Sequence, residues 1–220
     1  ISKYNYMEVN LKIPSSLNEI TLGQYQRFVQ LGDMEDAQAQ LKMIEIFCHV
    51  PPVIVRNMRA TDIAEICDII NNLFNTKHHL LNRFTCKGVQ YGFIPNLEDI
   101  TFGEYVDLDT FIGDNLNLHR AVNVLYRPIE HRTGDRYTIK EYDPNTSELA
   151  KQFPLDAVLG AVVFFYNLGK ELSTVILTSL DSKNQEILAE YLYSQESGGG
   201  TTASMDSLAE ILQSLNIPLN

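Results

Sequence analysis

A nine-residue pattern that occurs twice constrains the fold of this chain more than any other feature of its sequence. Residues 17–25 (LNEITLGQY) and residues 97–105 (LEDITFGEY), eighty positions apart, are identical at five of nine positions. Each copy places a threonine three residues before a glutamine or glutamate (Thr21 with Gln24, Thr101 with Glu104), which is the capping box that starts a helix. Two explanations stay open. Either a strand-to-helix unit is duplicated over residues 7–80 and 84–180, or two helices use the same N-terminal chemistry.

Helical periodicity dominates the rest of the sequence, since apolar residues recur every three or four positions. We predict helices from Thr21 to about Leu31, at Met34–His49, at Thr61–Asn75, at Val106–Tyr126 with a break near Gly113, from Leu155 to about Leu180 and at Ser182–Tyr193. We predict strands at Met7–Ile13 and Arg136–Tyr142, and a hairpin at Arg83–Ile94 that turns at Lys87-Gly88. The predicted fold class is mainly α with small β-hairpins (α+β), a helical bundle with short antiparallel strands.

The last part of the chain reads as a tethered helix. Residues 1–195 are predicted to form the mainly helical domain, residues 196–204 a Gly/Ser/Thr linker and residues 205–217 an amphipathic helix. Its apolar side chains recur at i, i+3, i+4 and i+7, and they are Leu208, Ile211, Leu212 and Leu215. A helix this short is marginal alone in water, so it needs a surface to lie against. That surface is either its own domain or a groove on a partner, and these four residues are the candidate partner-binding residues.

Charge and composition exclude several classes of protein. The chain has 17 basic and 28 acidic residues and a formal net charge of −11, so direct nucleic-acid binding is disfavoured. Three cysteines, an odd number, indicate a reducing compartment. No signal peptide is expected at the start, and the most apolar segment, Ala157–Leu168, is far shorter than the ~20 residues that span a bilayer. We therefore expect a soluble protein with no membrane partner.

No group of residues has the spacing of a metal site. Soft ligands gather between positions 48 and 86, but none has the Cys-x-x-Cys or His-x-x-x-His spacing that orients two ligands from one turn. They are Cys48, His49, Cys67, His78, His79 and Cys86. Asp107, Asp109 and Asp114, with His119 nearby, do not fit a calcium loop, which needs glycine at position six and glutamate at position twelve. We expect no metal.

Catalytic motifs are missing as well. The sequence has no nucleophile elbow and no phosphate-binding glycine loop. Four basic side chains surround a turn, and in so acidic a chain they are expected to pair with carboxylates. They are Arg127, His131, Arg132 and Arg136. We therefore expect no cofactor and no enzymatic activity.

Four segments taken together resemble a family of small proteins of tailed bacteriophages. They are residues 20–25 (ITLGQY), 100–109 (ITFGEYVDLD), 119–129 (HRAVNVLYRPI) and 154–169, which begins with PLDAVLG and ends with FFYNLG. That family is related to baseplate-hub assembly proteins of contractile-tailed phages and, more loosely, to tail assembly chaperones. The resemblance covers about Ile13 to Leu180, and none of the matching residues is a known catalyst.

The resemblance implies a non-enzymatic virion assembly or structural protein of the phage tail or baseplate. Such a protein would contact other virion or tail proteins, form a homo-oligomer such as a ring, and act in the host cytoplasm during assembly. An alternative is a permanent neck or head-to-tail ring (adaptor) subunit, which would stay in the mature virion. A remote alternative, from another class, is an unrecognised metal-binding protein or enzyme.

Overall fold

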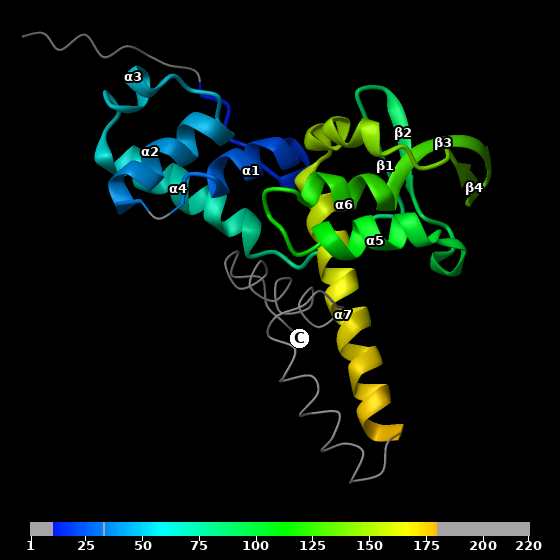
Figure 1. Cartoon of the computed structure of the whole chain (residues 1–220). Helices are drawn as coiled ribbons and strands as arrows, with labels where there is room; N and C mark the ends of the chain where they lie inside the picture. Colours follow the sequence, from blue (N-terminus) through cyan, green and yellow to red (C-terminus); the bar gives the residue numbers. More distant parts are fainter. Residues whose placement is uncertain (1–10, 33, 180–220) are drawn as a thin grey trace, which may run out of the picture.

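The chain folds into a mainly helical structure that contains one small sheet. The computed structural model describes residues 11–32 and 34–179. Its N-terminal helices lie on one side of the molecule, and a four-stranded antiparallel sheet with two further helices lies on the other (Figure 1). A long last helix begins between these two groups and projects beyond them. This mainly helical α+β architecture confirms the predicted fold class.

Short helices make up the N-terminal side. The 3₁₀-helix η1 (Leu17–Glu19) leads into α1 (Leu22–Val29), and α2 (Asp36–Phe47), α3 (Pro52–Val55) and α4 (Ala60–Phe74) follow. The predicted capping box starts α1, because the Thr21 hydroxyl accepts from the Gln24 amide N–H while the Gln24 side-chain oxygen accepts from the Thr21 N–H. Pro52 stands in the first turn of α3, where its missing N–H costs no hydrogen bond.

The sheet runs in the order β1 (Arg83–Cys86), β2 (Val89–Phe93), β3 (Tyr126–Thr133) and β4 (Arg136–Ile139), with every neighbouring pair antiparallel. The β1–β2 hairpin turns at Lys87-Gly88, as predicted. Both of these residues have positive φ (48° and 81°), which the tight two-residue turn requires. The β3–β4 hairpin turns at Gly134, whose φ is also positive (62°).

Two helices connect β2 to β3. The 3₁₀-helix η2 (Leu97–Asp99) leads into α5 (Phe102–Phe111), which starts with the second capping box, and α6 (Leu118–Leu125) follows. The break expected near Gly113 therefore exists. After the sheet come a long 3₁₀ segment, η3 (Pro144–Gln152), and the last described helix, α7 (Leu155–Ser179).

The core is one continuous apolar cluster to which every helical region contributes. Its centre is the first half of α7, where the sequence is apolar almost all round, as expected for a helix buried on every side. The fully buried residues of this half are Leu155, Ala157, Val158, Leu159, Ala161 and Val162. Gly160 lies against the backbone carbonyl of His79 so closely that a Cβ atom there would overlap it. The glycine is therefore what lets α7 pass through the middle of the molecule.

The strand predictions need correction, and the strand predicted at Arg136–Tyr142 is shorter than expected, since β4 ends at Ile139. Residues 11–13, the described part of the strand predicted at Met7–Ile13, are irregular, because Leu11 and Ile13 pack on the core and none of the described strands pairs with them. Strand β3 was not predicted. Pro128 lacks the N–H that a strand uses for pairing, and the charged residues around it do not alternate with apolar ones as in a half-buried strand. The helix predicted at Val106–Tyr126 also ends one residue early, because Tyr126 begins β3.

Candidate functional site

The candidate partner-binding residues Leu208, Ile211, Leu212 and Leu215 lie outside the described residues, as do the predicted linker and the helix at Ser182–Tyr193. Residues Val162–Leu168 of α7, from the most apolar segment of the chain, lie inside them. Val162 is fully buried, the aromatic stretch 164–166 is half-buried, and Asn167 is exposed. Phe164 and Phe165 also pack edge to face on each other and lie against Phe93 of β2. This stretch of α7 is therefore held by the domain itself.

The cysteines and histidines considered as metal ligands in the sequence do not form a common site in the described part of the chain. Cys48 and Cys67 are buried in the apolar core, where burial raises the pKa of the Cys48 thiol to about 11. His78 is half-buried, and burial lowers its pKa. Within residues 11–32 and 34–179, no three or more His, Cys, Asp or Glu side chains come close enough together to hold a metal ion. No helix in that part of the chain is long and apolar enough to cross a membrane.

Asp107 and Asp114 serve separate local contacts. Asp107 accepts a hydrogen bond of 2.8 Å from the Tyr142 hydroxyl. Asp114 caps the turn before α6 by accepting from the backbone N–H groups of Leu116 and Asn117. These carboxylates therefore stabilise loops and helix ends and form no shared site.

His119 lies buried at the start of α6 between two polar partners. Its Nδ1 is 3.1 Å from the Gln26 amide nitrogen, and its Nε2 is 3.3 Å from a Glu148 carboxylate oxygen. Burial, with Lys151 nearby, lowers the pKa of this imidazole, so its neutral form is favoured. It ties α6 to α1 and η3.

The basic stretch predicted around a turn lies on the β3–β4 hairpin. Its first member, Arg127, is nearly buried and pairs with the buried carboxylate of Glu104 at 2.7 Å. Because Glu104 also accepts the Thr101 N–H in the capping box, one carboxylate fixes both the start of α5 and its attachment to β3. His131, Arg132 and Arg136 are exposed on the hairpin.

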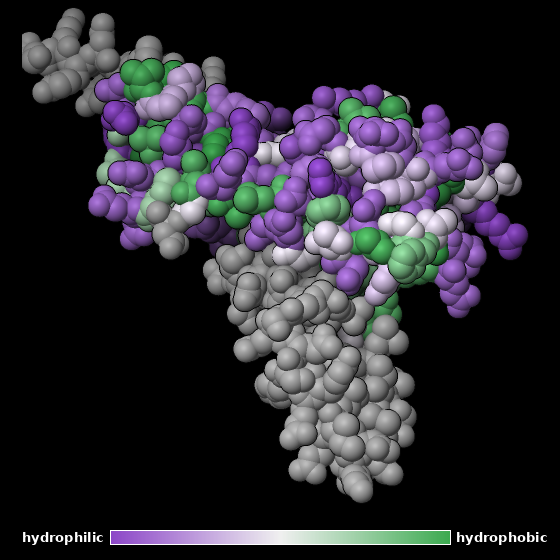
Figure 2. All heavy atoms as spheres, in the orientation of Figure 1, coloured by the Kyte–Doolittle hydropathy of each residue, from purple (hydrophilic) through white to green (hydrophobic). Residues whose placement is uncertain are grey.

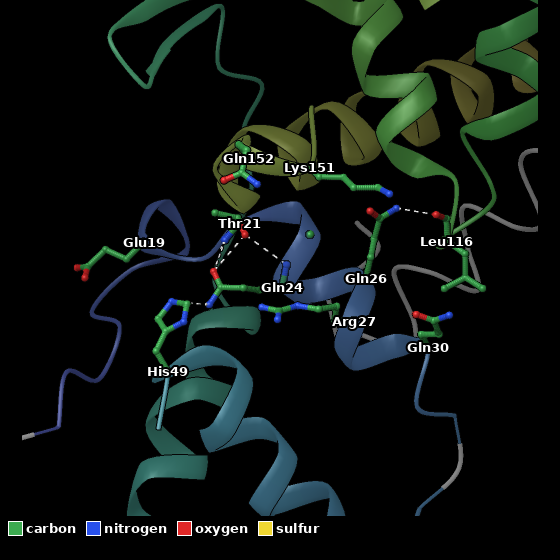
Figure 3. Close-up of a pocket in the computed structure, with 11 residues that line it drawn as sticks. Glu19, Thr21, Gln24, Gln26, Arg27, Gln30, His49, Leu116, Lys151 and Gln152 are labelled. Atoms are coloured by element: carbon green, nitrogen blue, oxygen red, sulfur yellow. Dashed lines mark hydrogen bonds between the residues drawn. The ribbon is translucent and has the colours of Figure 1, made fainter. Parts of the chain in front are cut away.

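A polar cleft of about 800 Å³ runs along one side of α1 (Figure 3). Its lining residues are Glu19, Thr21, Gly23, Gln24, Gln26, Arg27, Gln30, His49, Leu116, Lys151 and Gln152. The Gln24 amide donates to the Ile46 carbonyl at 2.8 Å and lies 3.2 Å from His49 Nε2. The only hydroxyl in the lining, that of Thr21, is engaged in the capping box. The cleft offers amides and cations for hydrogen bonding, but its lining contains no activated nucleophile.

An apolar surface on α5 is the other feature of note. Phe102 is 82% exposed, and Tyr105 and Val106, one turn further along the same face, are 43% and 42% exposed. Figure 2 shows apolar side chains at the surface in this region. The opposite face of α5 is anchored by the buried residues Glu104 and Leu108. We call Phe102, Tyr105 and Val106 the α5 face.

Sequence reasoning missed the α5 face for a clear reason. The i, i+3, i+4 spacing of its residues is also the spacing of a core-facing stripe. In the first copy of the repeat, the corresponding Leu22 and Tyr25 are indeed buried. Only the arrangement of distant segments distinguishes the two copies.

Comparison with known proteins gave no relative: no protein-family model, no curated protein and no solved structure matches this chain. The site must therefore be interpreted from its own geometry.

Proposed function

We propose that this protein is a non-enzymatic component of a bacteriophage tail or baseplate, an assembly or structural protein that acts by contacting other virion proteins. The α5 face is the observation that carries the contact part of this proposal. A phenylalanine exposed over four fifths of its surface, with two apolar neighbours on one rigid helix, is typical of a protein contact site.

The positions that carry the phage resemblance support a role in architecture. Glu104 and Arg127 form the buried ion pair that joins α5 to β3. The Tyr126 hydroxyl donates to the Leu81 carbonyl at 2.7 Å. Because Gly160 has no side chain, the backbone at His79 can pack directly against α7. These residues hold the fold together, which is what a structural signature without chemistry would do.

Counting copies of the chain in purified mature particles by quantitative mass spectrometry tests this proposal. A symmetric copy number such as six or twelve would indicate a permanent structural component, either of the tail or baseplate or, in the alternative role, a neck or head-to-tail ring subunit. Absence from particles together with abundance in infected-cell lysate and in tail intermediates would indicate an assembly factor. Absence from particles and from every tail intermediate would contradict both roles.

A further inference from the structure

The two copies of the repeated pattern have the same local conformation. In each, a single 3₁₀ turn (η1 or η2) is followed by an extended isoleucine, an extended threonine cap and a helix with a complete capping box. The two isoleucines lie in the same extended region, since Ile20 has φ −101° and ψ 135° and Ile100 has φ −62° and ψ 128°. The copies can therefore be compared residue by residue.

The first copy is covered by a distant segment of the same chain. Thr21 forms an antiparallel bridge with Pro154, in which the Leu22 N–H donates to the Phe153 carbonyl at 3.0 Å. The Leu155 N–H in turn donates to the Ile20 carbonyl at 2.8 Å. Under this cover Ile20, Leu22 and Tyr25 are buried, as their apolar character requires.

A glycine in the first copy fits the close approach of the cover. A Cβ atom at Gly23 would lie 3.0 Å from the backbone oxygen of Lys151, which is the closest distance a side-chain carbon tolerates. Glycine at the second position of a helix is otherwise unfavourable, because it costs backbone entropy. Close approach of the covering backbone is thus the physical reason for this residue.

The second copy has the same features and no cover among the described residues. Phe102 and Tyr105, which correspond to Leu22 and Tyr25, are exposed. The Phe102 N–H and the Ile100 carbonyl, which correspond to the two bonded backbone groups, have no hydrogen-bond partner in the described part of the chain. Gly103 opens onto empty space, with no atom of that part within 4 Å of where its Cβ would be.

We propose that residues Ile100–Val106 bind an extended segment of a partner protein, paired antiparallel to residues 100–102 in the way that Phe153–Leu155 pairs with the first copy. This inference rests on the proposed function only in taking the chain to act by protein contacts. It adds a site and a binding mode, the addition of a short strand to a free backbone edge with apolar side chains packed beside it.

The first copy also indicates the chemistry of the partner segment. Two apolar residues flank a central residue whose own N–H is not used, which is why proline is accepted there. The exposed carboxylates of Glu98 and Asp99 lie just before the proposed site Ile100–Val106, and they favour a cationic residue in the segment. We therefore expect an apolar–any–apolar segment with a lysine or arginine next to it.

Titration of the ¹⁵N-labelled full chain with the synthetic peptide Ala-Lys-Gln-Phe-Pro-Leu-Lys tests the proposal by NMR. This peptide copies the cover of the first site, with a final lysine added for the acidic rim. We expect saturable shifts of the amide signals of residues 100–106. A peptide with serine in place of phenylalanine and leucine should cause none. Shifts that are absent, or that centre on another surface, would overturn the proposal.

A matched pair of variants tests the backbone pairing itself. Phe102→Pro removes the N–H donor at the first helical position, where proline is well tolerated, whereas Phe102→Leu keeps both the donor and an apolar side chain. Loss of the peptide-induced shifts in Phe102→Pro and their retention in Phe102→Leu is the expected result. Equal binding by both variants would overturn it. Should Phe102→Pro melt early, Gly103→Val supplies the same test, because its side chain fills the space that the cover needs.

Two further outcomes keep this inference separate from the proposed function. If the same signals shift when the protein is concentrated without peptide, the occupant is a second copy of this chain, and the partner-segment proposal is wrong. If the peptide does not bind, this inference is wrong, but the copy number in particles can still support the proposed function. Conversely, absence of the chain from particles and tail intermediates contradicts the phage role while leaving the peptide result standing.

Discussion

At the scale of single residues, the fold depends on a few positions where no side chain fits. Gly160 is the strongest case, since it sits in the middle of the buried half of α7 against a rigid backbone carbonyl. Gly103 is its opposite, a helical glycine surrounded by open space. Replacing glycine by alanine should therefore change the free energy of unfolding in opposite directions at these two positions.

We expect Gly160→Ala to lower the free energy of unfolding by about 3 kcal/mol, because either α7 or the segment at His79 must shift to admit the methyl group. Gly103→Ala should raise it by roughly 0.5–1 kcal/mol, since alanine loses less backbone entropy in a helix. Urea unfolding of the two variants beside the parent chain measures both. A neutral Gly160→Ala would show that the close approach at His79 is not needed.

His119 makes stability depend on pH. Its pKa lies below the usual value of 6.5, so the unfolded chain binds the proton more tightly than the folded chain does. The stabilisation is fully present above about pH 6.5 and is lost as the pH falls through the folded pKa. We expect the free energy of unfolding to decrease as the pH falls below about 6.5, with His78 acting in the same direction.

The variant His119→Gln should flatten this decrease, because an amide retains hydrogen bonding to Gln26 without titrating. His131→Gln, at an exposed position on β3, is the matched control and should leave the slope unchanged. Urea unfolding at three pH values gives the slopes. An unchanged slope in His119→Gln would assign the pH dependence to other groups.

At the scale of elements, the Glu104–Arg127 pair joins α5 to the sheet. Glu104→Ala should cost about 3–5 kcal/mol, since it removes the capping-box acceptor and leaves the nearly buried Arg127 guanidinium uncompensated. Asp135→Asn breaks the exposed Arg83–Asp135 pair and should cost below about 1 kcal/mol. Thermal or urea unfolding compares them. Similar losses in the two variants would mean that burial of the Glu104 pair does not matter.

At the scale of the whole molecule, the tethered helix predicted at residues 205–217 is the next part to test. Leu212→Glu should abolish capture of the partner, because it puts a charge on the apolar stripe, and should leave the melting temperature nearly unchanged. Pull-down from infected-cell lysate and thermal unfolding measure the two effects. A large drop in melting temperature would instead mean that the helix belongs to the core. Ser214→Glu, outside the stripe, is the control.

Much of the local structure is predictable, because its causes lie close together in the sequence. The two capping boxes join residues three apart, and Lys87-Gly88 fixes a two-residue turn through its own backbone angles. Strand β3 is different, since Pro128 and its charged neighbours have no strand pattern and are held by pairing with β2. The strand predicted at Met7–Ile13 is absent in its described part for the converse reason. Its residues alternate as in a strand, but no described strand lies beside them to pair with.

By itself, the sequence determined where most helices start, which segments are apolar enough to form the core, and that two stretches share one helix-start design. Only the tertiary structure decided which of those two stretches is covered. Phe153–Leu155 lies far along the chain from the first copy, and it reaches that copy because α7 passes through the centre of the fold. Periodicity reports that a face is apolar. Which atoms bury that face depends on contacts between segments that are distant in the sequence, and those contacts leave Phe102 exposed while they enclose Leu22.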